Sequence, residues 1–272
     1  MDAQERDLLA EALRGTMTDT PAGAALDVAL AELGWADLLA EEPADAIPLV
    51  FALLGQTGAH APLVNDVLLA AIGAPIGGVV ALPYAGGRTV VWERADVVGE
   101  GTILDGPVPL RVVAADAADG GKAAADPVAL AAGRRALAWW LVGTGRAMLD
   151  LARTHALDRN QFGRPVAAFQ AVRHRLAETY VALEGAEATL TAADDELGAL
   201  LAKAAAGQAA LDAARHCQQV LGGVGFTAEH DLHHHIRRAL TLDGLLGNSR
   251  ELTREAGALI RARRTAPRLA QL

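Results

Sequence analysis

The chain has 272 residues, a formal net charge of −9 and a sequence pI near 5.3. This length is sufficient for one or two domains with a sizeable core. The negative charge disfavours binding to nucleic acid or to an anionic membrane, because both partners require a basic surface. No apolar run approaches the ~20 residues of a membrane span, and the acidic start Met1–Glu5 does not resemble a signal peptide. We therefore expect a cytoplasmic protein.

Cys217 is the only cysteine, which excludes an internal disulfide, and its apolar helical spacing predicts a core position.

The first half of the chain changes its pattern near residue 76. Apolar residues recur at helical spacing in four segments, and Gly and Pro separate these segments: Gln4–Leu13, Ala24–Leu33, Pro48–Leu54 and Pro62–Ile72. β-rich pieces bounded by Gly-Gly and Asp-Gly turns follow: Gly77–Leu82, Thr89–Trp92 and Leu110–Val113. We interpret residues 1–75 as a helical region and 76–125 as a small sheet plus an Ala/Asp/Gly-rich linker.

The second half, residues 126–272, predicts a helical bundle. Long helical patterns run from Pro127 to about Leu157, from Val166 to Ala193 and from Glu196 to Leu221, and shorter ones cover Leu232–Leu240 and Arg250–Arg264. Long helices joined by short loops pack as antiparallel bundles. The fold class is therefore predicted to be α+β, mainly α.

Two segments of this bundle carry groups suited to a diphosphate ligand. The first is Arg159-Asn160-Gln161-Phe162-Gly163-Arg164-Pro165, where Gly and Pro end a helix and place a cation and an aromatic ring in a loop. The second is Gln219-Val220-Leu221-Gly222-Gly223-Val224-Gly225, where a ligand can approach bare backbone closely. Arginine, glutamine and backbone N–H groups suit a diphosphate and its ribose. Taken alone, each segment also fits an ordinary loop that ends a helix.

Together, in this order and spacing, the segments resemble the C-terminal helical domain of the acyl-CoA dehydrogenases, flavoenzymes that desaturate acyl-CoA thioesters between the α and β carbons. The resemblance runs from about Gly133 to Leu246 and is to a short, actinobacterial-type member. It implies a truncated family architecture with a reduced β-domain. It also implies that six residues contact the ADP half of an FAD held mainly by a neighbouring subunit: Arg159, Gln161, Phe162, Gln219, Gly222 and Gly223. The family's Gly-Ser-Asp flavin loop and Trp-Ile-Thr segment are not recognisable, and Trp92 is expected to pack in the small sheet.

The base that the family's reaction needs is missing from the aligned positions. Desaturation removes an α-proton, so a carboxylate must face the flavin. Its two alternative positions in the family correspond here to Leu246 and Gly133, and neither residue accepts a proton. Asp243, Glu251 and Asp126 lie nearby but are displaced, and an offset of one helical residue turns a side chain by ~100°. Their ordinary interpretation is charge at helix ends.

The run His233-His234-His235 does not predict a metal site, because successive helical residues point in different directions. A solvated or interface-facing helix is the expected explanation.

These observations favour a subunit of an FAD-dependent acyl-CoA dehydrogenase that lacks its own catalytic residue. It would supply the ADP-side half of an FAD site at an interface with a longer acyl-CoA dehydrogenase subunit, as in a heterotetramer, and would meet the acyl-CoA substrate through that complex. One alternative is a scaffold subunit of the same fold that binds no flavin. Another is a self-sufficient homo-oligomer that uses a displaced carboxylate as its base.

Overall fold

The computed structural model describes residues 1–95, 102–104, 108–114 and 126–265. Its N-terminal part is helical and contains α1 (Ala3–Asp19), α2 (Ala24–Glu32), α3 (Trp35–Glu41), α4 (Pro43–Thr57) and α5 (Leu63–Ala71). α1 begins with a capping box, in which the Asp2 side chain accepts from the Glu5 N–H and the Glu5 side chain accepts from the Asp2 N–H. None of the described helices is long and apolar enough to cross a membrane.

Two features of this helical part differ from the sequence prediction. The pattern predicts a helix only from Pro48, whereas α4 begins at Pro43, a first position that tolerates proline because an N–H there would have no helical partner. Pro48 lies inside the helix. The pattern does not predict α3, since a segment between Gly34 and Glu42 is too short to show helical periodicity.

The strands β1 (Ala81–Tyr84), β2 (Arg88–Trp92) and β3 (Leu110–Val113) form an antiparallel sheet in that order. The predicted second and third strands are confirmed. The first strand begins at Ala81 instead of Gly77, because the backbone N–H groups of Gly77 and Val80 donate to the side chains of Asp66 and Asn65 in α5. These hydrogen bonds hold the segment that precedes β1 against α5.

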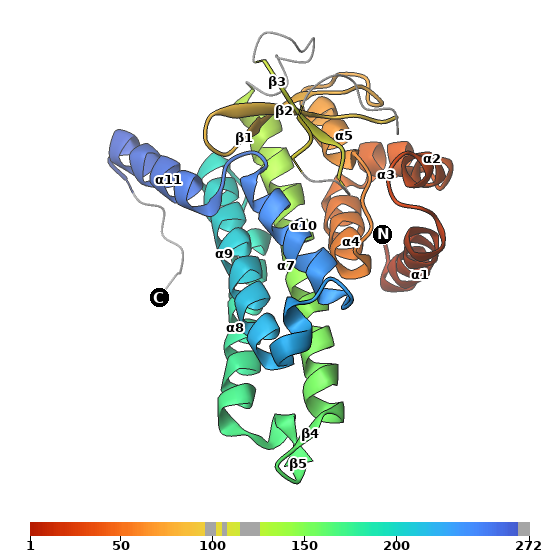
Figure 1. The fold of residues 1–272 in the computed structure, drawn as a ribbon. Coiled ribbons are helices and arrows are strands. Elements are labelled where there is room, and N and C mark those ends of the chain that lie inside the picture. The colour runs from red at the N-terminus through yellow and green to blue at the C-terminus, as the bar shows by residue number, and fades with distance from the viewer. Residues whose placement is uncertain (96–101, 105–107, 115–125, 266–272) are drawn as a thin grey trace.

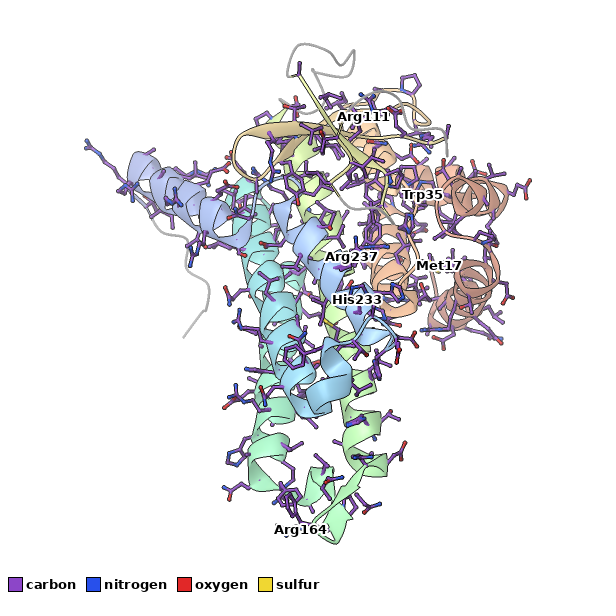
Figure 2. All side chains as sticks on the ribbon, viewed as in Figure 1. Met17, Trp35, Arg111, Arg164, His233 and Arg237 are labelled. Carbon is purple, nitrogen blue, oxygen red and sulfur yellow. The ribbon has the colours of Figure 1, made fainter. Side chains whose placement is uncertain are left out.

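The bundle consists of α7 (Pro127–Asp158), α8 (Gln170–Thr191), α9 (Glu196–Leu221), α10 (Leu232–Gly244) and α11 (Ser249–Arg263). A short hairpin, β4 (Asn160–Gln161) and β5 (Arg164–Pro165), joins α7 to α8. Figure 1 shows that this hairpin lies at the end of the molecule opposite the sheet. Arg164, labelled in Figure 2, marks that end, whereas Trp35 and Arg111 lie near the other. The α+β, mainly α, fold class is confirmed.

The helices α4 and α7 cross where both expose bare backbone. A Cβ atom added to Gly143 would lie 2.2 Å from the carbonyl oxygen of Ala52, and one added to Gly55 would lie 2.4 Å from the Thr144 nitrogen. Contacts this short are not possible between real atoms, so both positions require glycine for the observed approach. The N-terminal helices therefore pack directly against the bundle.

Aromatic residues join the sheet, the N-terminal helices and the bundle in one core. Trp92 of β2 stacks on Trp140 of α7 with 5.7 Å between ring centroids, and Phe51 of α4 meets the same indole edge-on at 5.7 Å. Trp92 thus packs in the sheet as expected, but against the bundle as well. Cys217 is also buried in this core, as predicted, and burial raises the pKa of its thiol to about 12.

Candidate functional site

The first predicted segment forms the hairpin that follows α7. The Arg159 N–H donates to the His155 carbonyl (2.9 Å), and the Arg159 carbonyl accepts from the Val166 N–H (2.8 Å). Phe162 (φ 52°) and Gly163 (φ 78°) both adopt the left-handed conformation between β4 and β5. Such a two-residue turn normally contains Asn or Gly at its first position. The chain therefore holds an aromatic residue where the backbone does not favour one.

Packing within the chain does not account for Phe162. Its side chain is 91% exposed, and its ring meets Phe169 only edge-on, with centroids 6.1 Å apart. The guanidinium of Arg164 lies over the Phe169 ring, 4.3 Å from its centroid. The hairpin thus presents an aromatic ring and cations to the surroundings.

The second predicted segment follows α9. Gly222 ends the helix with φ 63°, and Gly225 is required by packing, because a Cβ there would lie 2.8 Å from the Gln218 carbonyl oxygen. Neither backbone conformation nor packing requires glycine at position 223, because its φ is not positive and a Cβ there would meet nothing within 4 Å. Gln219 is exposed, and its side chain makes no hydrogen bond to a described residue. An open backbone and a free amide are therefore available to a ligand or another chain.

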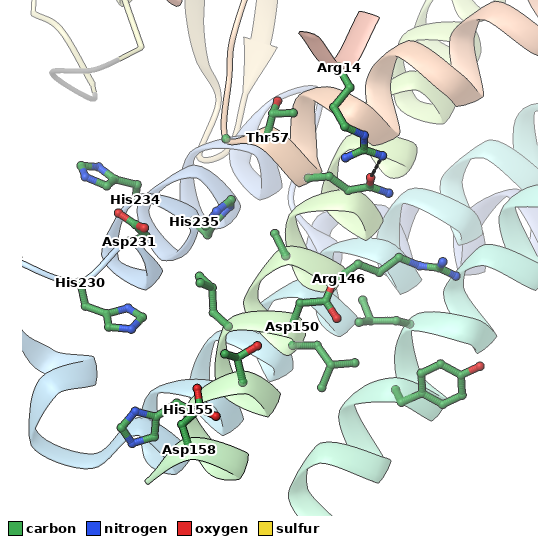
Figure 3. Close-up of a pocket in the computed structure, with 18 of the residues that line it drawn as sticks. Arg14, Thr57, Arg146, Asp150, His155, Asp158, His230, Asp231, His234 and His235 are labelled. Carbon is green, nitrogen blue, oxygen red and sulfur yellow. Dashed lines mark hydrogen bonds between the residues drawn. The ribbon is translucent and has the colours of Figure 1, made fainter. Parts of the chain in front are cut away.

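A groove of about 1220 Å³ runs along α7 between α4, α8 and the start of α10 (Figure 3). Arg159 lines it, whereas Gln161, Phe162, Gln219, Gly222 and Gly223 do not. The six predicted cofactor residues thus lie at the end of α7, on the hairpin, in the last turn of α9 and on the loop after it, and only Arg159 lines this groove. The carboxylate and imidazole side chains that line the groove are Asp150, His155, Asp158, Glu184, His230, Asp231, His234 and His235.

The sequence does not show that the histidines of this groove form a group. His155 lies on α7 and His230 on the loop before α10, and they meet only in the fold. Burial, the nearby His230 and Arg159 lower the pKa of His155. His235 is buried rather than solvated, and burial together with Arg238 lowers its pKa to about 4. The expectation of a solvated or interface-facing helix does not hold for His235, which is buried within the chain and packs over Gly58. Within the described ranges, no group of three or more His, Cys, Asp or Glu side chains could hold a metal ion.

The two positions aligned with the family's base, Gly133 and Leu246, face each other. A Cβ on Gly133 would lie 2.8 Å from a methyl carbon of Leu246 and 2.8 Å from one of Leu68. Both leucines are fully buried. Hydrocarbon therefore surrounds both positions.

The turn that carries Leu246 is attached to the sheet and to the bundle. The Leu246 N–H donates to the Pro83 carbonyl (2.8 Å), and the Leu246 carbonyl accepts from Arg134 Nε (3.1 Å). Lys203, fully buried in α9, donates to the carbonyls of Asp243 (2.9 Å) and Gly247 (2.7 Å), and burial lowers its pKa to about 7. The sequence shows Lys203 only as a lysine within an Ala-rich helix. Its role depends on contacts with residues at least 40 positions away, which the sequence pattern does not reveal.

The displaced carboxylates near this turn each hold local structure. Asp126 caps α7 by accepting from the Val128 and Ala129 N–H groups. Asp243 accepts from the Ser249 hydroxyl (2.7 Å) and N–H (3.2 Å). Glu251 accepts from the N–H groups of Gly86 and Asn248, and these hydrogen bonds lower its pKa. Asp126 and Glu251 agree with the ordinary interpretation of acidic charge at the start of a helix, whereas Asp243 lies in the last turn of α10.

The helical bundle matches a known protein family. Residues 120–258 match the family model described as "Acyl-CoA dehydrogenase, C-terminal domain". The chain therefore belongs to the acyl-CoA dehydrogenase family.

Curated relatives match over less than half of the chain. This chain is 41% identical over 130 residues to acyl-CoA dehydrogenase FadE34 of Mycobacterium tuberculosis, and the match covers 44% of this chain and 18% of that protein. It is 36% identical over 120 residues to acyl-CoA dehydrogenase IpdE2 of Mycolicibacterium smegmatis, covering 43% and 39%. The aligned part thus spans well under half of either relative.

Solved structures match the fold over nearly the whole chain. A chain of the Tcur3481-Tcur3483 steroid acyl-CoA dehydrogenase variant superposes with a TM-score of 0.72 at 21% identity, covering 97% of this chain and 99% of that one. A chain of the ChsE4-ChsE5 complex from Mycobacterium tuberculosis gives 0.68 at 19%, covering 98% and 99%. At these identities the likeness is one of fold.

Proposed function

We propose that this chain is a subunit of a heteromeric FAD-dependent acyl-CoA dehydrogenase that supplies the ADP-side half of a flavin site and no catalytic base. The observation that carries the proposal is a division within the chain. Hydrogen-bonding groups that have no partner among the described residues lie at the hairpin end, whereas buried leucines fill the position expected for the family's base. Two of the structural neighbours, Tcur3481-Tcur3483 and ChsE4-ChsE5, are each named for two proteins, which supports a partner subunit.

The residues at the hairpin end suit an ADP group. Arg159 makes no ion pair with a described residue and can neutralise a phosphate. Gln161 and Gln219 provide neutral hydrogen-bonding groups, and the bare backbone at Gly222 and Gly223 permits close approach. Phe162 offers a ring for apolar contact. Since only Arg159 of these residues lines the groove of this chain, the partner would complete the site.

The opposite end does not suit the flavin ring. Strand β1 and the residue after it hydrogen-bond directly to the end of α10 and to the turn that follows: the Ala85 N–H donates to Gly244 O (2.8 Å) and the Leu246 N–H to Pro83 O (2.8 Å). A Cβ on Gly244 would lie 2.4 Å from the Tyr84 ring. The sheet therefore packs tightly against the segment that would have to face a flavin and a thioester.

The roles of the two subunits follow from this division. FAD, when bound, supplies the hydride acceptor of the family's reaction. This chain's residues would hold the anionic diphosphate and exclude water from it. The α-proton would be removed by a carboxylate of the longer partner, because Leu246 and Gly133 cannot accept it.

The experiment is copurification of the chain with the product of a neighbouring gene, followed by measurement of bound flavin per complex. Arg159→Ala should leave the complex assembled but weaken FAD binding by about 1.5–3 kcal/mol, because a charge-assisted contact is removed. Arg153→Ala is the matched control, since Arg153 is also exposed near the end of α7 but does not line the groove.

Two results would contradict the proposal. Unchanged flavin content in the Arg159→Ala complex would indicate a scaffold that binds no flavin through this end. Tightly bound, stoichiometric FAD in the isolated chain would indicate a self-sufficient homo-oligomer.

A further inference from the structure

Two histidines share the groove along α7 with Arg159. His155 lies one helical turn before Arg159, whose N–H donates to the His155 carbonyl (2.9 Å), so the two side chains project from the same face of the helix. His230 reaches the same groove from the loop before α10. Figure 3 shows His155 and His230 near the end of the groove that Asp158 lines. The fold thus brings two imidazole rings from distant segments to the arginine of the proposed flavin contact.

Both rings have nitrogen atoms that can bind a ligand. Nδ1 of His230 accepts from the Leu232 N–H (3.1 Å), so the neutral ring carries its proton on Nε2 and can donate from there. Neither Nε2 of His230 nor the ring of His155 makes a hydrogen bond to a described residue. An acceptor that enters the groove, such as a phosphate oxygen, can therefore receive hydrogen bonds from both histidines.

The protonation of these histidines decides the sign of the charge at this end of the groove. The histidine end is defined here by His155, Asp158, Arg159, His230 and Asp231, and its fixed charges are one guanidinium and two carboxylates. Its formal net charge is therefore −1 when both histidines are neutral and +1 when both are protonated. A diphosphate is repelled by the first state and attracted by the second.

The surroundings of His155 favour its neutral form until an anion arrives. Burial lowers the pKa of His155, and His230 and Arg159 lower it further, whereas Asp158 opposes them. A phosphate beside the ring has the opposite effect, because a nearby anion stabilises the imidazolium. Binding of an anion at the histidine end is therefore coupled to proton uptake.

We propose that His155 and His230 bind the diphosphate of FAD together with Arg159, and that their protonation makes flavin binding to the complex tighten as pH falls. The inference rests on the proposed function, which assigns the flavin contact to Arg159. It adds a pH dependence that Arg159 cannot supply, because a guanidinium stays charged where histidine titrates. The affinity rises as pH falls through the pKa of the histidines in the bound state, and it levels off once they are protonated in the free state as well.

The test is titration of the FAD-depleted complex with FAD between pH 8 and pH 6, followed by flavin fluorescence. Each proton taken up can tighten binding by up to about tenfold per pH unit, so we expect the wild-type Kd to fall by about tenfold or more over this range. Replacing both histidines, by His155→Gln and His230→Gln, should flatten the dependence and leave weak binding at every pH.

Two further variants sharpen the test. His155→Arg keeps a cation at every pH and should tighten binding at pH 8. His174→Gln is the matched control, since His174 is exposed on α8 and does not line the groove, and it should keep the wild-type dependence. Circular dichroism of each variant separates lost flavin binding from lost folding.

The inference fails if the wild-type Kd is the same at pH 8 and pH 6, or if the variant without both histidines keeps the wild-type dependence. Should Arg159→Ala weaken FAD binding while either of these results is found, the proposed function stands and this inference alone is refuted. A complex that binds no FAD at any pH would contradict both.

Discussion

Phe162 combines a left-handed backbone with an exposed aromatic ring, and the two features oppose each other energetically. A residue with a bulky side chain at φ 52° is uncommon, whereas Asn tolerates this conformation. Since packing within the chain does not hold the ring, its retention is best explained by a contact made outside the chain.

This explanation predicts opposite effects of Phe162→Asn on stability and on function. The isolated chain should be as stable as the wild type or more stable, by up to about 1 kcal/mol, because the turn is relieved of strain. FAD retention in the complex should fall. Urea unfolding and flavin content measure the two effects, and a large loss of stability would show that the ring packs within the fold.

At the scale of elements, the crossing of α4 and α7 depends on the missing side chains of Gly55 and Gly143. Gly55→Ala should separate the helices and destabilise the chain by about 1–3 kcal/mol, the usual range for overpacking. Gly185→Ala is the matched control in α8, where a Cβ meets nothing within 4 Å and alanine should stabilise the helix by about 0.5–1 kcal/mol. Thermal unfolding of both variants decides whether bare backbone is required at the crossing.

The turn after α10 gives a second prediction at this scale. Leu246→Glu restores a carboxylate at the family's aligned position, yet the isolated chain should remain inactive with a panel of acyl-CoAs and an artificial electron acceptor. The new carboxylate would be buried against Leu68 and Gly133, at a cost of a few kcal/mol in stability. Robust turnover would show that a complete flavin site exists within this chain.

These elements also show what the sequence could predict. The long helices and two strands follow from periodicity. The start of α4 and the whole of α3 were missed because Pro43 and a short segment carry little periodic signal. Lys203, the groove histidines and the glycine crossing depend on contacts between distant segments, which periodicity does not encode.

For the whole molecule, one hydrophobic core joins the N-terminal helices, the sheet and the bundle, so buried histidines in it affect global stability. Burial and Arg238 lower the pKa of His60 to about 3, from an ordinary value of 6.5. Between pH 6.5 and about 3, His60 is protonated in the unfolded chain but neutral in the folded chain. The contribution of His60 to stability is therefore present above pH 6.5 and is lost as pH falls toward 3.

His60→Gln should accordingly make the free energy of unfolding less dependent on pH between 6.5 and 4. His174→Gln, at an exposed position on α8, is the control and should keep the wild-type slope. Urea unfolding at several pH values measures both. Equal slopes in the wild type and His60→Gln would show that His60 is not held neutral in the fold.

The stacked pair Trp92 and Trp140 has a spectroscopic consequence. The chain's four tryptophans are Trp35, Trp92, Trp139 and Trp140, and none lies on the hairpin or on the loop after α9. Intrinsic fluorescence therefore reports chiefly on how the sheet and the N-terminal helices pack against α7, and little on the hairpin end. A tryptophan introduced by Phe162→Trp would add one emitter at the opposite end of the molecule, where quenching by flavin or burial by a partner would register separately from unfolding.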